Sequence, residues 1–179
     1  MKKFIERGEE RRKSERDAAG RHGRREKFSD RRHGNNKQYV TFFLENYYLG
    51  VSVEKIQEVF QTKEMTGVPL APEGIAGLIN LRGHIISTID LRRALGFGMS
   101  ASKDEMMSVV VRTTEGEINL LVDKIGDVIE VLPVLFEPAP KTLDEHLLKV
   151  VEGIYKLDDR LLLVLNTEAI SKIGEPAIG

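Results

Sequence analysis

Residues 77–92 read GLINLRGHIISTIDLR, and this stretch decides the local fold. Two apolar runs flank a polar corner, Asn80-Leu81-Arg82-Gly83, whose glycine can adopt backbone angles that other residues avoid. The pattern predicts two strands joined at residues 80–84. Holding an arginine beside apolar surface is costly unless it meets a partner, so we expect Arg82 to face a partner group.

The end of the same stretch predicts a short helix. Asp90 can cap the segment LRRALGF, residues 91–97, and Gly96 suits the point where the helix stops. The polar segment GMSASKDE that follows, residues 98–105, is typical of a linker or a long loop.

Upstream of this stretch, QYVTFFLE (38–45) and residues 49–53 alternate apolar and other side chains with a period of two, which predicts strands. The segment VEKIQEVF (53–60) fits either a helical turn or an extended strand. VPLAPEGIAG, residues 68–77, contains two prolines and is expected to be a loop.

Downstream, two hairpins are predicted. The first joins MMSVVVRT (106–113) to EINLLVDKI (117–125) through a turn at Glu115-Gly116. The second joins LLKVVEGIYKL (147–157) to RLLLVLN (160–166), and a final helix capped by Asn166 or Thr167 is expected after it.

Two blocks of short strands, each closed by a short helix, predict a mostly β chain with a pair of small barrels rather than one large sheet. We place the folded body at residues 38–175 and its second barrel at approximately 104–165. The 179 residues suffice for one sizeable domain or two very small ones.

The N-terminal segment differs in composition from the rest. Residues 1–37 hold fourteen Lys and Arg against seven Asp and Glu, whereas the remainder holds thirteen against twenty-one. With few large apolar side chains, this segment is expected to be a disordered basic tail. Such a tail could contact nucleic acid or anionic lipid, but its basic residues alternate with acids, which favours a solvated tail.

Most catalytic and metal-binding patterns are missing from the sequence. It has no cysteine, no HExxH pair among its four histidines, no P-loop and no GxSxG elbow. No apolar run approaches the ~18 residues of a membrane span, and no signal peptide is recognisable. By elimination, the body is predicted to be a binding module without metal or cofactor.

Several motifs resemble the CheW family of chemotaxis coupling proteins. They are IQEVF (56–60), the run from GLINLRG to RRALG (77–96), VVVRTTEGEINLLVDKIGDVIEV (109–131) and EGIYKLDDRLLLVLN (152–166). The resemblance covers residues 38–173 and implies two five-stranded, SH3-like barrels side by side around a shared apolar interface. It also implies a protein without catalytic activity and without a cofactor.

The partners implied by this resemblance are a CheA-type histidine kinase and the cytoplasmic tip of methyl-accepting chemoreceptors. Further CheW-like domains could join them in arrays. The protein would be cytoplasmic and recruited to membrane-associated receptor arrays, with no membrane insertion of its own and no role for nucleic acid. An alternative is a nucleic-acid-binding protein that acts through the basic tail, and an enzyme with an unrecognised site is a third reading.

The resemblance also implies a receptor-binding site. In the family, the arginine of NLRG and the acidic residue of the IxEV segment lie close together at a receptor-facing groove, which here corresponds to Arg82 and Glu58. We expect Glu58 to hold Arg82 at the rim of an apolar groove between the two barrels. The other residues expected to form it are Ile56, Gly77, Asn80 and Ile86. The residues that contact the kinase are not assigned.

Three residues depart from the family pattern. His84 replaces a residue that is commonly apolar, Ser87 replaces a proline, and Thr88 replaces another apolar residue. We expect His84 to be exposed at the corner and none of the three to disturb the fold, although they could alter the choice of receptor. Which receptor or output pathway the protein serves is not encoded in these motifs.

Overall fold

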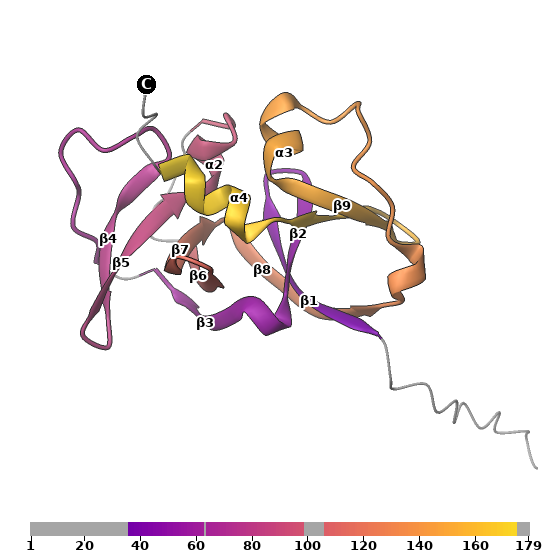
Figure 1. Ribbon diagram of the computed structural model, residues 1–179, viewed down its shortest axis with the longest axis horizontal. Coiled ribbons are helices and arrows are strands. Elements are labelled where there is room, and N and C mark those ends of the chain that lie inside the picture. The colour runs from indigo at the N-terminus through magenta and orange to yellow at the C-terminus, as the bar shows by residue number, and fades with distance from the viewer. Residues whose placement is uncertain (1–35, 63, 99–105, 175–179) are drawn as a thin grey trace, which may run out of the picture. The chain divides into compact units, whose positions relative to one another are not determined.

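The computed structural model describes residues 36–62, 64–98 and 106–174, which form two five-stranded sheets and a few short helices (Figure 1). Apart from Asn36 and Lys37, the predicted tail lies outside the described residues, as does most of the linker at 98–105. The strands are β1 (Lys37–Leu44), β2 (Tyr47–Ser52), β3 (Ile56–Gln61), β4 (Ile75–Leu81), β5 (His84–Asp90), β6 (Met107–Thr113), β7 (Gly116–Val122), β8 (Lys124–Val131), β9 (Val151–Lys156) and β10 (Leu161–Leu165). The helices are α2 (Leu91–Ala94), α3 (Glu145–Val150) and α4 (Thr167–Ser171), with 3₁₀ turns η1 (Val53–Lys55), η3 (Pro133–Leu135) and η4 (Lys172–Gly174).

One sheet has the strand order β3-β6-β7-β5-β4, and we call it the central barrel because its strands follow one another within residues 56–122. Hairpins pair β4 with β5 and β6 with β7 in antiparallel register. Between these hairpins, β5 runs parallel to β7, with Ile89 opposite Leu120. The parallel pair brings the two hairpins together on one sheet.

The other sheet has the order β8-β1-β2-β10-β9, and we call it the terminal barrel because both ends of the body contribute to it. β1 and β2 form an antiparallel hairpin, and β2 then pairs in parallel with β10, where Leu49 lies opposite Leu163. Figure 1 shows the two sheets, each curled on itself, with α4 lying across the side where they meet.

The chain order of the barrels differs from the prediction. The prediction of a second barrel at approximately 104–165 is wrong. Strand β6 pairs with β3 and strand β7 pairs with β5, so β6 and β7 belong to the central barrel. The terminal barrel instead takes its first two strands from residues 37–52. Alternation of side chains identifies a strand but carries no information on a partner that lies far away in the sequence.

The largest apolar cluster draws on both barrels. Phe42 and Leu49 of the terminal barrel and Val109 and Leu120 of the central barrel are fully buried in it. Burying one such side chain stabilises the fold by about 1.5–3 kcal/mol. The shared cluster therefore holds the two barrels together, as the resemblance implied.

The burial of both faces of strand β6 explains why its sequence contains a continuous apolar run. Val109 and Val111 face the shared cluster, whereas Val110 packs inside the central barrel against Ile79 and Ile86. Both faces of the strand are buried, so strict alternation with polar residues is not needed.

The helix ends follow the predicted capping. The Asp90 side chain accepts a hydrogen bond from the Arg93 amide, and Asn166 accepts from the amides of Glu168 and Ala169. Three short stretches were predicted wrongly: residues 75–77 belong to β4 and not to a loop, residues 124–125 belong to β8 and not to the strand before it, and residues 147–150 belong to α3 and not to a strand. Leu147 and Val150 are both buried, and a spacing of three places them on one side of a helix.

Candidate binding groove on the central barrel

The β4–β5 hairpin turns at Arg82 and Gly83, which have φ angles of 53° and 91°. Two successive residues with positive φ form the primed type of turn that suits a two-residue hairpin. Asn80 supports the turn, since its Oδ1 accepts a hydrogen bond from the Gly83 amide at 2.9 Å. The corner in the sequence is therefore a tight hairpin that projects Arg82 from the end of the sheet.

Arg82 faces Glu58. Its Nη2 lies 3.0 Å from Glu58 Oε2, with 72% of the Arg82 side chain exposed and 26% of the Glu58 side chain. Glu58 lies on β3 and Arg82 follows β4, and these are the two end strands of the sheet order. The ion pair thus spans the two edges of the central barrel, and the expected contact between these two residues is present.

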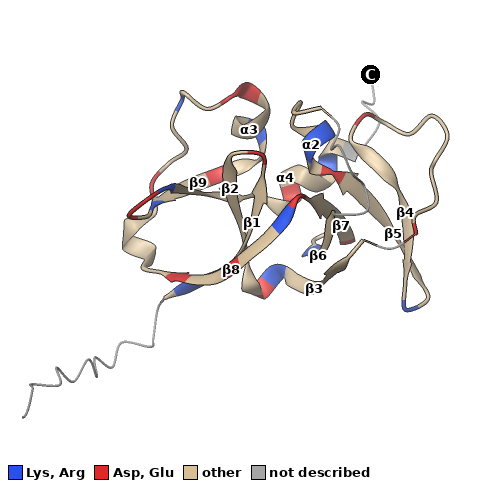
Figure 2. Cartoon of the chain, turned by 180° about the vertical axis from the view of Figure 1, so that it is seen from behind, with Lys and Arg blue, Asp and Glu red and all other residues tan. Residues whose placement is uncertain are grey.

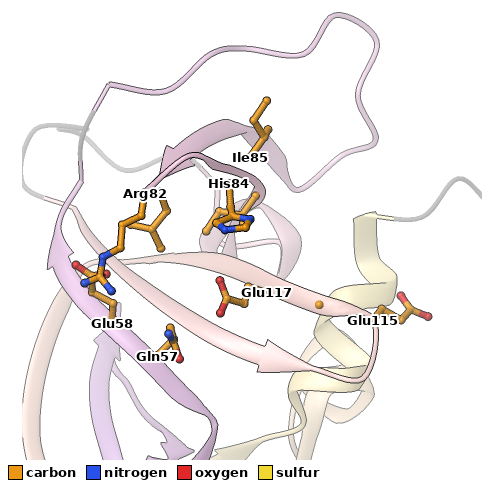
Figure 3. Close-up of a pocket in the computed structure, with 10 residues that line it drawn as sticks. Gln57, Glu58, Arg82, His84, Ile85, Glu115 and Glu117 are labelled. Atoms are coloured by element: carbon orange, nitrogen blue, oxygen red, sulfur yellow. The ribbon is translucent and has the colours of Figure 1, made fainter.

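A cavity of about 590 Å³ opens beside this ion pair (Figure 3). The residues that line it are Gln57, Glu58, Leu81, Arg82, His84, Ile85, Ile86, Glu115, Gly116 and Glu117. They come from β3, from the β4–β5 hairpin and from the β6–β7 hairpin, all in the central barrel. We call this cavity the Arg82 groove; its lining includes no residue of the terminal barrel, unlike the inter-barrel groove that was expected.

The Arg82 groove combines an apolar part with a charged rim. Leu81 and Ile86 are buried beneath it, while Ile85 leaves 72% of its surface in contact with solvent. An exposed branched side chain beside an open cavity is a ready contact for another apolar surface. In Figure 3, Arg82 extends toward Glu58 on one side and Ile85 points away from the sheet on the other.

The structure brings together only part of the predicted site. Glu58, Arg82 and Ile86 line the groove, and Asn80 shapes its hairpin. Ile56 instead packs against the shared apolar cluster. Gly77 lies against residues 65 and 66, where an added Cβ would be 2.5 Å from the Thr66 carbonyl oxygen.

Sequence reasoning missed the groove residues that come from other strands, above all Gln57, Glu115 and Glu117. Gln57 directly precedes Glu58 in a segment that the sequence left ambiguous between a helical turn and a strand. Glu115 and Glu117 reach the groove only because β7 pairs with β5. The Glu115-Gly116 turn was recognised in the sequence, but nothing in it indicated which surface it would border.

The three departures from the family pattern have clear positions. His84 and Ser87 are exposed, as was expected for His84. Thr88 is fully buried, and its Oγ1 accepts a hydrogen bond from Asn119 Nδ2 at 3.2 Å. The same Asn119 amide also donates to Ser108 Oγ. Asn119 therefore gives the buried hydroxyl of Thr88 a hydrogen-bond partner, which offsets the cost of burying that hydroxyl.

Neither a metal centre nor a membrane span is found in the described part of the chain. Within it, no group of three or more His, Cys, Asp or Glu side chains is arranged to hold a metal ion. No helix among the same residues has the length and apolar character needed to cross a membrane.

Comparison with known proteins gives a consistent result. The CheW-like domain pattern matches residues 38–174. The chemotaxis protein CheW of Bacillus subtilis (strain 168) is 28% identical over 134 residues, which cover 75% of this chain and 86% of that protein. The chemotaxis protein CheW of Helicobacter pylori (strain ATCC 700392 / 26695) is 29% identical over 137 residues, with coverages of 75% and 81%.

A solved structure agrees as well. The crystal structure of the scaffolding protein TtCheW from Thermoanaerobacter tengcongensis superposes with a TM-score of 0.70 at 31% identity, covering 79% of this chain and 94% of that one. These matches give no support to the alternative of nucleic-acid binding through the basic tail. The chain belongs to the CheW-like domain family, a family of non-enzymatic scaffolding proteins of chemotaxis.

Proposed function

We propose that this protein is a cytoplasmic adaptor that couples methyl-accepting chemoreceptors to a CheA-type histidine kinase at membrane-associated receptor arrays. The names of its relatives support a role in chemotaxis, and the scaffolding character of TtCheW supports a role in assembly. The proposal assigns two separate surfaces, one for each partner.

The receptor surface is the Arg82 groove, and the observation that carries it is the Arg82–Glu58 ion pair at the groove mouth. Glu58 compensates the charge of Arg82 from one side, while most of the Arg82 side chain stays exposed. A planar guanidinium can then lie against a helical partner and still donate hydrogen bonds. Ile85 supplies apolar contact area next to it.

The kinase surface is an apolar segment on the terminal barrel, residues 128–136. Five of its side chains are exposed large hydrophobics: Val128, Leu132, Val134, Leu135 and Phe136. Val134 alone leaves 84% of its surface in solvent. Such a concentration of exposed apolar groups marks an interaction surface, and its location on the other barrel leaves the Arg82 groove open.

The test measures the two partners separately. Binding of a purified chemoreceptor hairpin-tip fragment and of the kinase's CheW-like regulatory domain would be titrated against wild-type protein, Arg82→Ala, Glu58→Ala and Val134→Asp. The Arg82 and Glu58 variants should bind the receptor fragment more weakly and keep kinase affinity. Val134→Asp should show the reverse.

Lys149→Ala provides a matched control, because Lys149 forms an exposed ion pair with Glu145 at 3.0 Å on α3, outside the groove. It should leave both affinities unchanged. The Arg82→Ala/Glu58→Ala double variant should lose less affinity than the sum of the single losses, since each single change leaves one charge uncompensated. Wild-type receptor affinity in Arg82→Ala would refute the assignment of the groove.

A further inference from the structure

The carboxylates of the Arg82 groove differ in whether a positively charged side chain is paired with them. Glu58 is paired with Arg82. Glu117, the second residue of β7, is half-buried, and Figure 3 shows its carboxylate turned into the cavity below His84. Across the described residues, no Lys, Arg or His lies within ion-pair distance of Glu117.

The charged residues next to Glu117 leave its negative charge in the cavity uncompensated. Arg112 lies directly opposite it in the β6–β7 hairpin, but the Arg112 guanidinium donates to Gln57 Oε1. Glu115, at the turn, is directed away from the cavity in Figure 3. The lining therefore presents three carboxylates against one guanidinium, and only Glu117 is both unpaired and turned inward.

We propose that the groove selects a partner segment that carries a lysine or arginine next to an apolar side chain, and that Glu117 is the residue that recognises this positive charge. The proposal rests on the proposed receptor function of the groove and specifies the chemistry of the receptor segment that fits it. The basic side chain would enter beside Glu117 while its apolar neighbour packs on Ile85 at the rim.

Two physical reasons favour Glu117 over the other acids. A half-buried carboxylate is shielded from water, so a charge-assisted hydrogen bond to it is stronger than one at an open surface. A carboxylate that already has a partner, as Glu58 has, gains less from a second cation. Rim charges such as Glu115 mainly affect the association rate and its salt dependence.

The experiment titrates a purified chemoreceptor hairpin-tip fragment against wild type, Glu117→Gln, Glu73→Gln and Arg82→Ala at pH 8, above the range in which histidine side chains ordinarily titrate. Glu117→Gln keeps the shape of the side chain and removes only its charge. We expect it to weaken binding about fivefold and to flatten the salt dependence of the dissociation constant. Glu73→Gln is the matched control, because Glu73 is an exposed carboxylate outside the groove lining, and it should change affinity less than about twofold.

A charge exchange completes the test. The same fragment with its tip lysines and arginines changed to glutamate should bind wild type poorly and regain affinity with Glu117→Lys. If Arg82→Ala weakens binding but Glu117→Gln and the exchange have no effect, the role of Glu117 is overturned and the receptor groove stands. If Arg82→Ala leaves the affinity at the wild-type value, the receptor function of the groove is itself refuted, and the role of Glu117 with it.

Discussion

Arg92 donates a hydrogen bond to Asp123 Oδ2 at 2.7 Å where the chain passes from the central to the terminal barrel. Arg92 lies on α2 and Asp123 between β7 and β8, and the same guanidinium reaches Glu45, in the β1–β2 turn, at 2.6 Å. Figure 2 shows this basic stretch of α2 beside acidic positions of the neighbouring strands. One arginine thus links α2 with two segments that border the terminal barrel.

Removing this link should destabilise the fold. Only 15% of the Arg92 side chain is exposed, so Arg92→Ala leaves Asp123 and Glu45 partly shielded and uncompensated. We expect a loss of about 2 kcal/mol in the free energy of unfolding, measured by urea titration. Asp123→Ala combined with Arg92→Ala should cost less than the two separate losses; strict additivity would show that the pair is not coupled.

The buried hydroxyl of Thr88 should matter only together with Asn119. Thr88→Val removes an acceptor from the Asn119 amide inside the central barrel and should cost about 1–2 kcal/mol. Adding Asn119→Leu should recover part of this loss, because no amide then needs a partner. The check is a thermal unfolding series on the single and double variants, and a double variant that loses the full sum would contradict the compensation.

Gly77 should prove structural. A Cβ at this position would lie 2.5 Å from the Thr66 carbonyl oxygen, and Thr66 is fixed to Leu78 by backbone hydrogen bonds of 2.9 and 2.8 Å. Gly77→Ala is expected to cost about 2–3 kcal/mol. At Gly83 no atom lies within 4 Å of an added Cβ, so Gly83→Ala should cost only the strain of its positive φ, about 1 kcal/mol. Equal losses in the two variants would argue against a steric role for Gly77.

Leu70 should be replaceable with a gain in stability. It has a φ of 58°, in a region that leucine rarely adopts, and its side chain is fully exposed. Leu70→Asn should raise the free energy of unfolding by about 0.5–1 kcal/mol and the Tm accordingly, because asparagine tolerates this conformation better. Leu161→Asn, at an exposed site in strand β10, serves as the control and should not stabilise. An unchanged or lower Tm in Leu70→Asn would mean that the strain is negligible.

Alkaline pH should destabilise the terminal barrel through Tyr39. Burial raises the pKa of the Tyr39 hydroxyl in the folded protein above its ordinary value of 10. The unfolded chain therefore loses this proton first, so the contribution is fully present below about pH 10 and is lost as the pH rises above it. The urea midpoint of Tyr39→Phe should fall less between pH 9 and pH 11 than that of the wild type, and parallel declines would contradict this assignment.

Several local features follow from the sequence because their causes are local. The apolar alternation of β1, the β4–β5 hairpin and the capping by Asp90 and Asn166 depend on residues within a few positions of one another. The pairing of Arg82 with Glu58 was also predicted, but it came from the family resemblance, because 24 positions of sequence separate the two residues and no local rule joins them.

The tertiary structure alone decided which strands share a barrel and which side chains share the groove. Parallel pairing of β5 with β7 brings Glu117 to the cavity beside Arg82, and pairing of β3 with β6 places Gln57 there. Ile56 and Gly77 belong to the same sequence motifs as Glu58 and Arg82, yet they pack elsewhere. Periodicity determines which residues form a strand, whereas the neighbours of that strand are selected by long-range packing of the complete sheet, which depends on all strands at once.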